Sequence, residues 1–207
     1  MALTLQSLPA ALEPMRPYLR KAAELGRVSP LTALALRMFA MQIGITLQHK
    51  LPPTDMQYLL LLMDELEAEK RALGVSATGE EQAAAVKKLA FDLYERARHS
   101  DKPELTHPTA SNKWTVVEAP RVAQAYHASA VVLDALRLFH DTRELPPPLH
   151  QQQASAHRRS QQLAAQLSRA LQSAPCVPPE WRPFPPNLLR KPAAPTKPPA
   201  AAPPSPS

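Results

Sequence analysis

Proline divides this 207-residue chain into two parts of different character. Thirteen of its 25 prolines lie between Pro175 and Pro206, and the whole chain has only four glycines. Proline lacks a backbone N–H and clashes with the preceding helical turn, so such a segment cannot form helices or central strands. It also has too little apolar surface to bury. We therefore predict a disordered Pro-rich tail over 175–207 and a folded part that ends near residue 174.

The formal net charge of +6 follows the same division. Residues 157–207 contain seven Lys or Arg and one acidic residue, whereas residues 1–156 contain 17 of each sign. A nucleic-acid-binding protein carries its basic residues clustered on a folded face. Here the excess is spread over the last helix and a Pro/Ala spacer. The pattern therefore predicts no nucleic-acid partner.

The compartment is indicated by what the chain lacks. Its single cysteine, Cys176, argues against a disulfide framework and fits a reducing compartment. The N-terminal residues 1–15 have neither the basic region nor the continuous apolar region of a secretory signal. We expect no segment that reaches the length of a membrane span. The interpretation is a soluble, cytoplasmic protein.

Apolar spacing in the first 174 residues is helical nearly throughout. The first three expected helices cover about 9–27, from Ser29 to the Leu-Pro-Pro break at 51–53, and about 54–73, before Gly74. A second set follows: a helix from the capping-box match of Thr78 and Glu81 to about Asp101, one starting near Pro120, and one over about 149–173. Short links between helices of this length favour antiparallel bundles. We predict an all-α fold of two antiparallel three-helix bundles, over 5–75 and 78–174.

No pattern of catalytic chemistry emerges. The seven histidines do not form the pair at i and i+4 that a zinc hydrolase helix needs. No nucleophile elbow is present, and four scattered glycines cannot form a phosphate-binding loop. The acidic cluster over residues 64–69 is interpreted as a solvated helix face. We predict that the chain is not an enzyme and binds no cofactor or metal.

The stretch "YLLLLMDELE" at 58–67 carries more apolar surface than one core-facing stripe requires. On a helical wheel Leu59, Leu62, Met63, Leu66 and Leu73 share one stripe. Leu60 lies to one side and Leu61 nearly opposite. Two explanations stay open: an exposed shoulder that accepts an amphipathic partner helix, or burial of the surplus against the second bundle. For Leu61 we expect burial against the second bundle.

Three segments resemble a known family. They are "LEPMRPYLRKAAEL" at 12–25, "SPLTALALRMFAMQIGITL" at 29–47 and "LLMDELEAEKRALG" at 61–74. The matching residues are Pro30, Ala33, Arg37, Met38, Phe39, Ala40, Met41, Gln42, Gly44, Met63, Leu66, Glu67 and Lys70. Together they resemble the N-terminal domain of the Vta family, cofactors of the vacuolar-sorting AAA ATPase in the ESCRT pathway.

The resemblance implies two MIT modules in tandem, each a three-helix bundle. It implies a non-enzymatic adaptor that binds C-terminal helices of ESCRT-III subunits and regulates the ATPase in multivesicular body sorting. Such an adaptor is cytoplasmic and reaches the endosomal membrane only through its partners. Met63 matches a family contact position on the first module. Leu60, Asp64 and Glu67 join it because the helical wheel places them on the same shoulder.

The chain departs from the family pattern in three places. In the second module an aromatic pair of the last helix is replaced by Ser160 and Leu163, so we expect only a possible second site at Ser160, Leu163 and Leu167. A longer insert, 102–119, replaces an acidic turn between the fourth and fifth helices. The family's C-terminal helical hairpin, which binds the ATPase, is not in this sequence. We expect ATPase binding only if that hairpin exists beyond this chain.

Two further interpretations stay open. Pro192, Pro195 and Lys197 match the P-x-x-P-x-K pattern of SH3 ligands, although a plain spacer is the favoured interpretation. The chain as a whole has a second interpretation: a helical scaffold whose apolar surface serves packing between the bundles or self-association.

Overall fold

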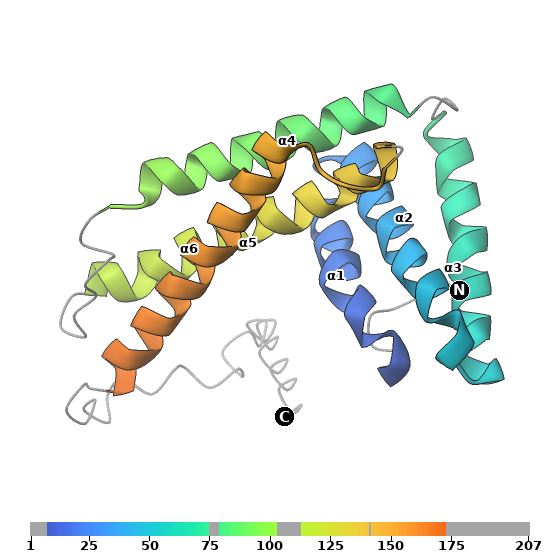
Figure 1. Cartoon of the computed structure of the whole chain (residues 1–207), viewed down its shortest axis with the longest axis horizontal. Coiled ribbons are helices and arrows are strands. Elements are labelled where there is room, and N and C mark those ends of the chain that lie inside the picture. Colours follow the sequence, from blue (N-terminus) through green and yellow to red (C-terminus); the bar gives the residue numbers. More distant parts are fainter. Residues whose placement is uncertain (1–7, 75–78, 103–112, 141, 173–207) are drawn as a thin grey trace, which may run out of the picture. The chain divides into compact units, whose positions relative to one another are not determined.

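A computed structural model describes residues 8–74, 79–102, 113–140 and 142–172 of the chain, and there it is all-α, which confirms the predicted fold class (Figure 1). The α-helices are α1 (Arg16–Leu25), α2 (Pro30–Leu47), α3 (Pro53–Ala72), α4 (Glu80–Ser100), α5 (Lys113–Ala135) and α6 (Pro147–Gln172). Short 3-10 turns are η2 (Ala10–Met15), η3 (Gln48–Lys50) and η5 (Leu136–Phe139). The Pro-rich tail, with Pro192, Pro195 and Lys197, lies outside the described residues.

The ends of α2 and α3 follow the punctuation in the sequence. Ser29 precedes α2 and Pro30 opens it, where the missing proline N–H leaves no intrahelical bond unmade. α3 ends at Ala72, and Gly74 adopts the left-handed conformation with φ +60°. Its N–H donates to the carbonyl of Arg71 at 3.2 Å, which satisfies one of the orphan carbonyls at the helix end.

One expected helix start is wrong. α5 begins at Lys113, seven residues before the predicted start at Pro120, so Pro120 lies inside the helix. A proline removes one backbone bond but need not end a helix that tertiary packing supports. α4 begins at Glu80, and the residue before it is Gly79 at φ +64°, with no side-chain cap. Thr78 of the predicted capping box lies outside the described residues.

The first three helices enclose a core with η2. Its buried residues are Leu8, Leu12, Met15, Leu19, Leu34, Ala40, Tyr58, Leu59, Leu62 and Leu66. α2 and α3 approach closely at Gly44, where an added Cβ would lie 2.5 Å from Leu59 Cδ2. This contact fixes which side of α3 is buried.

A second core joins the two predicted bundles. It contains Ala22 of α1 and Ala33, Ala35 and Leu36 of α2, together with Val86, Ala90, Val131, Val132, Leu133, Ala135, Leu136 and Leu145 from the second half of the chain. Gln82 of α4 also donates its amide to the carbonyl of Leu31 at 3.2 Å. A third core lies among α4, α5 and α6 and includes Ala97, Val122, Tyr126, Ala156 and Leu163. Residues 1–173 accordingly form one compact unit, and the boundary at 75–78 stays a prediction.

The expectation that no segment is long enough to cross a membrane is wrong. Residues Pro30–Lys50, which include α2, are long and apolar enough by length and composition, with a mean hydropathy of 1.4. A helix that is apolar on every side is also what a buried central helix requires. α2 packs against α1, α3, α4 and α5, and this position explains its composition.

Candidate partner-binding face

α3 presents one buried and one exposed side. Leu59, Leu62 and Leu66 are buried in the first core. Leu60 and Met63 are 53% and 41% exposed, although both are large apolar residues. Apolar side chains that remain in water on a folded helix are available to a partner.

The four expected contact residues form one exposed face of α3. Leu60, Met63, Asp64 and Glu67 follow the spacing i, i+3, i+4 and i+7, which places them on the same side of an α-helix. Asp64 and Glu67 are both exposed. We call these four residues the α3 face: two apolar anchors flanked by two negative charges.

The expectation that Leu61 is buried against the second bundle is wrong, because Leu61 is 54% exposed. The described parts of the two halves share a core of residues from α1, α2, α4 and α5, to which α3 contributes none. Packing between the bundles therefore does not explain the surplus apolar surface of α3.

Glu69 has a structural role that the sequence did not indicate. Its Oε2 accepts a hydrogen bond from Arg37 Nη1 of α2 at 2.8 Å, and both side chains are partly buried. It was grouped with Asp64, Glu65 and Glu67 in an outward acidic face. The pair spans 32 residues of sequence, so no local pattern marks it.

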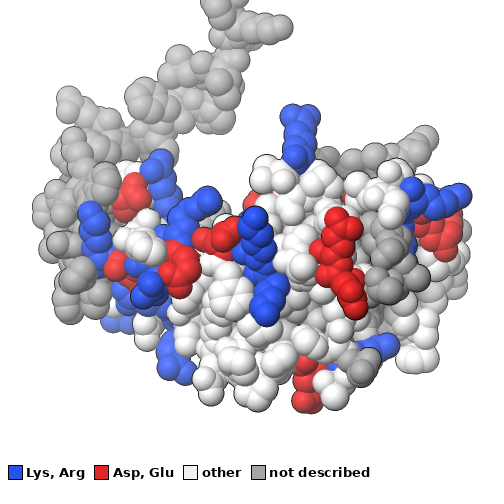
Figure 2. Space-filling model, turned by 90° about the horizontal axis from the view of Figure 1, so that it is seen from above, with Lys and Arg blue, Asp and Glu red and all other residues white. Residues whose placement is uncertain are grey.

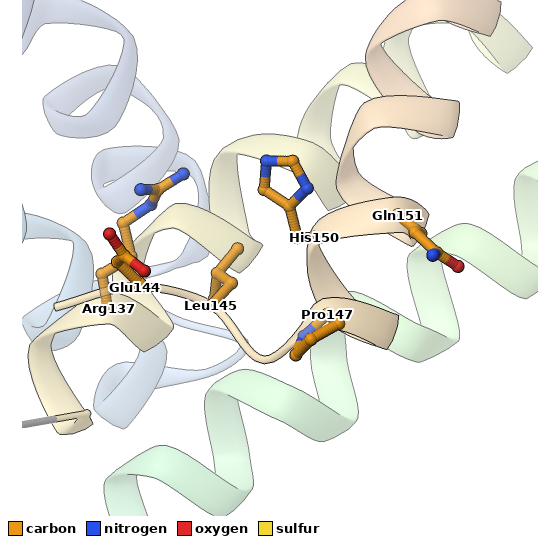
Figure 3. Close-up of a pocket in the computed structure, with 6 residues that line it drawn as sticks. All are labelled: Arg137, Glu144, Leu145, Pro147, His150 and Gln151. Atoms are coloured by element: carbon orange, nitrogen blue, oxygen red, sulfur yellow. The ribbon is translucent and has the colours of Figure 1, made fainter. Parts of the chain in front are cut away.

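A pocket of about 420 Å³ opens elsewhere, at the start of α6 (Figure 3). It is lined by Arg137, Glu144, Leu145, Pro147, His150 and Gln151. Arg137 already donates to Asp134 at 3.2 Å and to Gln153 at 3.3 Å. Within the described residues no group of three His, Cys, Asp or Glu side chains is placed to hold a metal ion.

A comparison with known protein families assigns this helical chain to one of them. The family described as Vta1 like matches residues 14–173, more than three quarters of the chain. The chain belongs to the Vta1-like family. This confirms the resemblance carried by the first three helices, and the match also covers α4, α5 and α6.

Curated Vta1-like relatives share the same region at low identity. The vacuolar protein sorting-associated protein VTA1 homolog of Bos taurus is 24% identical over 139 residues, which cover 66% of this chain and 41% of the relative. The proteins of the same name from Mus musculus and Homo sapiens are each 25% identical over 138 residues, covering 65% of this chain and 40% and 41% of the relative. The chain therefore spans about two fifths of the length of these relatives.

The residues expected for a second site in this Vta1-like chain do not form one exposed surface. Leu163 is only 1% exposed and packs in the third core. Ser160 and Leu167 are half-buried. A partner would reach Leu163 only by opening the bundle, so any second site would have to be built from other side chains of α6.

Charges of both signs are mixed on the visible face of this Vta1-like chain (Figure 2). On the face seen from above, acidic and basic side chains alternate over the described residues, and no continuous basic stripe is visible there (Figure 2). On α1, α4 and α5, basic side chains pair with acidic ones three residues away: Lys21 with Glu24, Arg98 with Glu95 and Arg121 with Glu118.

Proposed function

We propose that this Vta1-like chain is a non-enzymatic adaptor that binds C-terminal helices of ESCRT-III subunits through the α3 face. The observation that carries the proposal is the exposure of Leu60 and Met63 at helical spacing beside two acids. An amphipathic helix can place Leu side chains on these anchors and basic side chains opposite Asp64 and Glu67. Electrostatic complementarity of this kind favours basic-flanked helices over acidic ones.

The wider role follows from the family. Its relatives are named vacuolar protein sorting-associated proteins. We propose that the chain acts in multivesicular body sorting as a cytoplasmic protein recruited to endosomes by its partners. Regulation of the vacuolar-sorting AAA ATPase is proposed only for a protein that also carries the family's helical hairpin. The tandem modules over 5–75 and 78–174 are part of the same proposal.

The test is a titration of C-terminal ESCRT-III peptides into the full chain, followed by amide chemical shifts and by calorimetry. Shifts are expected along α3 around Met63. Met63→Asp places an unpaired charge in the interface and should weaken binding at least about tenfold, which corresponds to about 1.4 kcal/mol. Met63 is exposed, so this variant should still fold, and circular dichroism checks that it does.

Leu61→Asp is the matched control. Leu61 lies on the same helix and is 54% exposed, against 41% for Met63, but the helical wheel places it outside the α3 face. This variant should retain the affinity of the natural chain. Equal loss in both variants, or full affinity in Met63→Asp, would contradict the proposed face.

A second candidate function is a scaffold that self-associates through exposed leucines, and the exposure of Leu61 favours it. Sedimentation distinguishes the two. A dimer that Leu61→Glu dissociates would support self-association, whereas a monomer at all concentrations would exclude it.

A further inference from the structure

One carboxylate, Asp134 of α5, joins three helices. Tyr18 Oη of α1 donates to Asp134 Oδ2 at 3.1 Å. Arg137 Nε and Gln153 Nε2 donate to Oδ1 at 3.2 and 2.8 Å, the latter from α6. Gln153 also donates to the carbonyl of Ala130 at 3.3 Å. Here the Asp134 carboxylate accepts hydrogen bonds from Arg137, Tyr18 and Gln153, so the positive charge of Arg137 is paired within the chain.

The next turn of the same three helices brings positive groups together. Residues three, four or seven apart share a helix face, so α1 presents Lys21 one turn from Tyr18, α6 presents His157 one turn from Gln153, and α5 presents His127 seven residues before Asp134. The rings of His127 and His157 lie edge to face with centroids 6.0 Å apart. We call Arg20, Lys21, His127 and His157 the histidine junction.

The charges at the histidine junction do not balance. Glu24 pairs with Lys21 and, at 3.9 Å, with Arg20. Within the described part of the chain, neither imidazole makes a hydrogen bond to another group. Burial, and then the charges of His157, Lys21 and Arg20, lower the pKa of His127. The turn therefore holds two cations and two protonatable rings around a single acid.

We propose that the histidine junction binds an acidic peptide segment of a partner protein, with a partner carboxylate accepting hydrogen bonds from the imidazoles. This carboxylate would do for the two imidazoles what Asp134 does for the donors of Tyr18, Arg137 and Gln153. A peptide is favoured over a membrane because the Lys21 side chain is only 15% exposed, which a single carboxylate can reach and a flat lipid surface cannot. The site lies on α1, α5 and α6, so it is separate from the α3 face.

Binding at this junction depends on pH. The titratable and charged groups at the junction are Arg20, Lys21 and Glu24 from α1, His127 from α5 and His157 from α6. Arg158 is the neighbouring exposed cation on α6. A bound carboxylate stabilises the protonated imidazoles and so raises the pKa of His127 in the complex. Protons are then taken up on binding. The affinity should rise as the pH falls below 7, by at most about tenfold per pH unit for each histidine that takes up a proton.

The experiment uses the full chain with labelled histidines and a peptide of alternating glutamate and alanine. Resonances of His127 and His157 should shift on titration, and more at pH 6 than at pH 7.5. The same peptide with glutamine in place of glutamate should cause no shift. Inorganic phosphate and phosphatidylserine vesicles are the other arms. A response to either of these without a response to the glutamate peptide would overturn the proposal.

Matched variants separate the junction from general charge. His127→Gln with His157→Gln should abolish the pH dependence and weaken binding several-fold. Arg158→Gln removes an exposed charge next to His157 on α6 and should retain the pH dependence. If the double variant fails to fold, Arg20→Gln, on an exposed side chain, should weaken binding instead. Equal binding by all variants, or equal loss in Arg158→Gln, would overturn the proposal.

Discussion

At the scale of single residues, Gly44 is the position where the first bundle tolerates least change. A Cβ there would lie 2.5 Å from Leu59 Cδ2 and 3.0 Å from Met15 Sδ. Gly44→Val should lower the free energy of unfolding by about 2 kcal/mol, because overpacking a closed core typically costs about 1–3 kcal/mol. Urea unfolding of the variant and the natural chain measures the difference.

Gly26→Ala is the control for that prediction. Its added Cβ would meet no atom closer than 3.6 Å, and its φ of −53° suits any residue. It should leave stability unchanged or raise it by up to about 1 kcal/mol. Similar destabilisation by both substitutions would mean that the close α2–α3 approach is not the cause.

The contact residues of α3 show how far sequence reasoning reaches at this scale. Leu60, Met63, Asp64 and Glu67 were placed on one shoulder by helical periodicity alone, and the structure leaves all four exposed. Leu61 was misjudged because periodicity gives the direction of a side chain but not what lies opposite it. Leu163 was named from alignment with a family position, and its burial depends on α4 and α5, which α6 alone cannot indicate.

At the scale of helices, an ion pair links α6 to Asp101, the residue that follows α4. Arg159 Nε and Nη2 donate to the two oxygens of Asp101 at 2.7 and 2.6 Å, and Tyr126 Oη donates to Asp101 Oδ2 at 3.1 Å. Arg159→Lys keeps the charge but loses the bidentate geometry. It should lower the free energy of unfolding by about 1 kcal/mol, which is the usual size of one hydrogen bond.

Arg158→Lys is the control for the ion pair, because Arg158 is exposed on the same helix. Hydrogen exchange adds a local measurement: amides of α6 should exchange faster in Arg159→Lys than in Arg158→Lys. Unchanged exchange in Arg159→Lys would show that the third core alone holds α6 in place.

The helices themselves were largely predictable from the sequence, and the exceptions have physical reasons. α2 and α3 carry clear start and stop signals at Ser29, Pro30 and Gly74. The sequence predicts a start of α5 at Pro120 because proline is common at the first position of a helix. In the structure α5 begins seven residues earlier, at Lys113. A local rule cannot reveal that packing supports a helix through an internal proline.

At the scale of the whole described unit, the shared core was not predictable. Small side chains, among them Ala22, Ala33 and Ala90, let helices of both halves approach closely. Alanine is also the commonest helix former, so its position in a sequence does not distinguish a contact from an exposed turn. The Tyr18–Asp134 bond spans 116 residues and has no local signal either. Helical periodicity predicts the two sets of three helices, but it does not predict which residues form the core that the two sets share.

The free energy of unfolding of the described unit should decrease both at mildly acid pH and at strongly alkaline pH. The pKa of His127 is lowered from 6.5, mainly by burial, so the unfolded chain binds more protons than the folded one as the pH falls through that value. The contribution of neutral His127 to the free energy of unfolding is therefore fully present above pH 7 and decreases as the pH falls below about 6.5. The pKa values of Tyr18 and Tyr126 are raised from 10, mainly by burial and then by Asp134 and Asp101, so stability should decrease again as the pH rises above 10.

Thermal unfolding from pH 5.5 to pH 11 tests this plateau. His127→Gln should flatten the acid side between pH 7 and 5.5 and leave the alkaline side unchanged, because it removes the group that the folded state keeps neutral. Tyr18→Phe should leave the acid side unchanged and reduce the alkaline decrease without removing it, because Tyr126 still contributes. Some stability should also be lost at pH 8 from the missing bond to Asp134. If stability begins to fall at the same acid pH in His127→Gln as in the natural chain, the loss of stability at low pH would be due to carboxylates and not to His127. In that case an acidic peptide should still bind the histidine junction more tightly at pH 6, since that linkage concerns the complex and not unfolding.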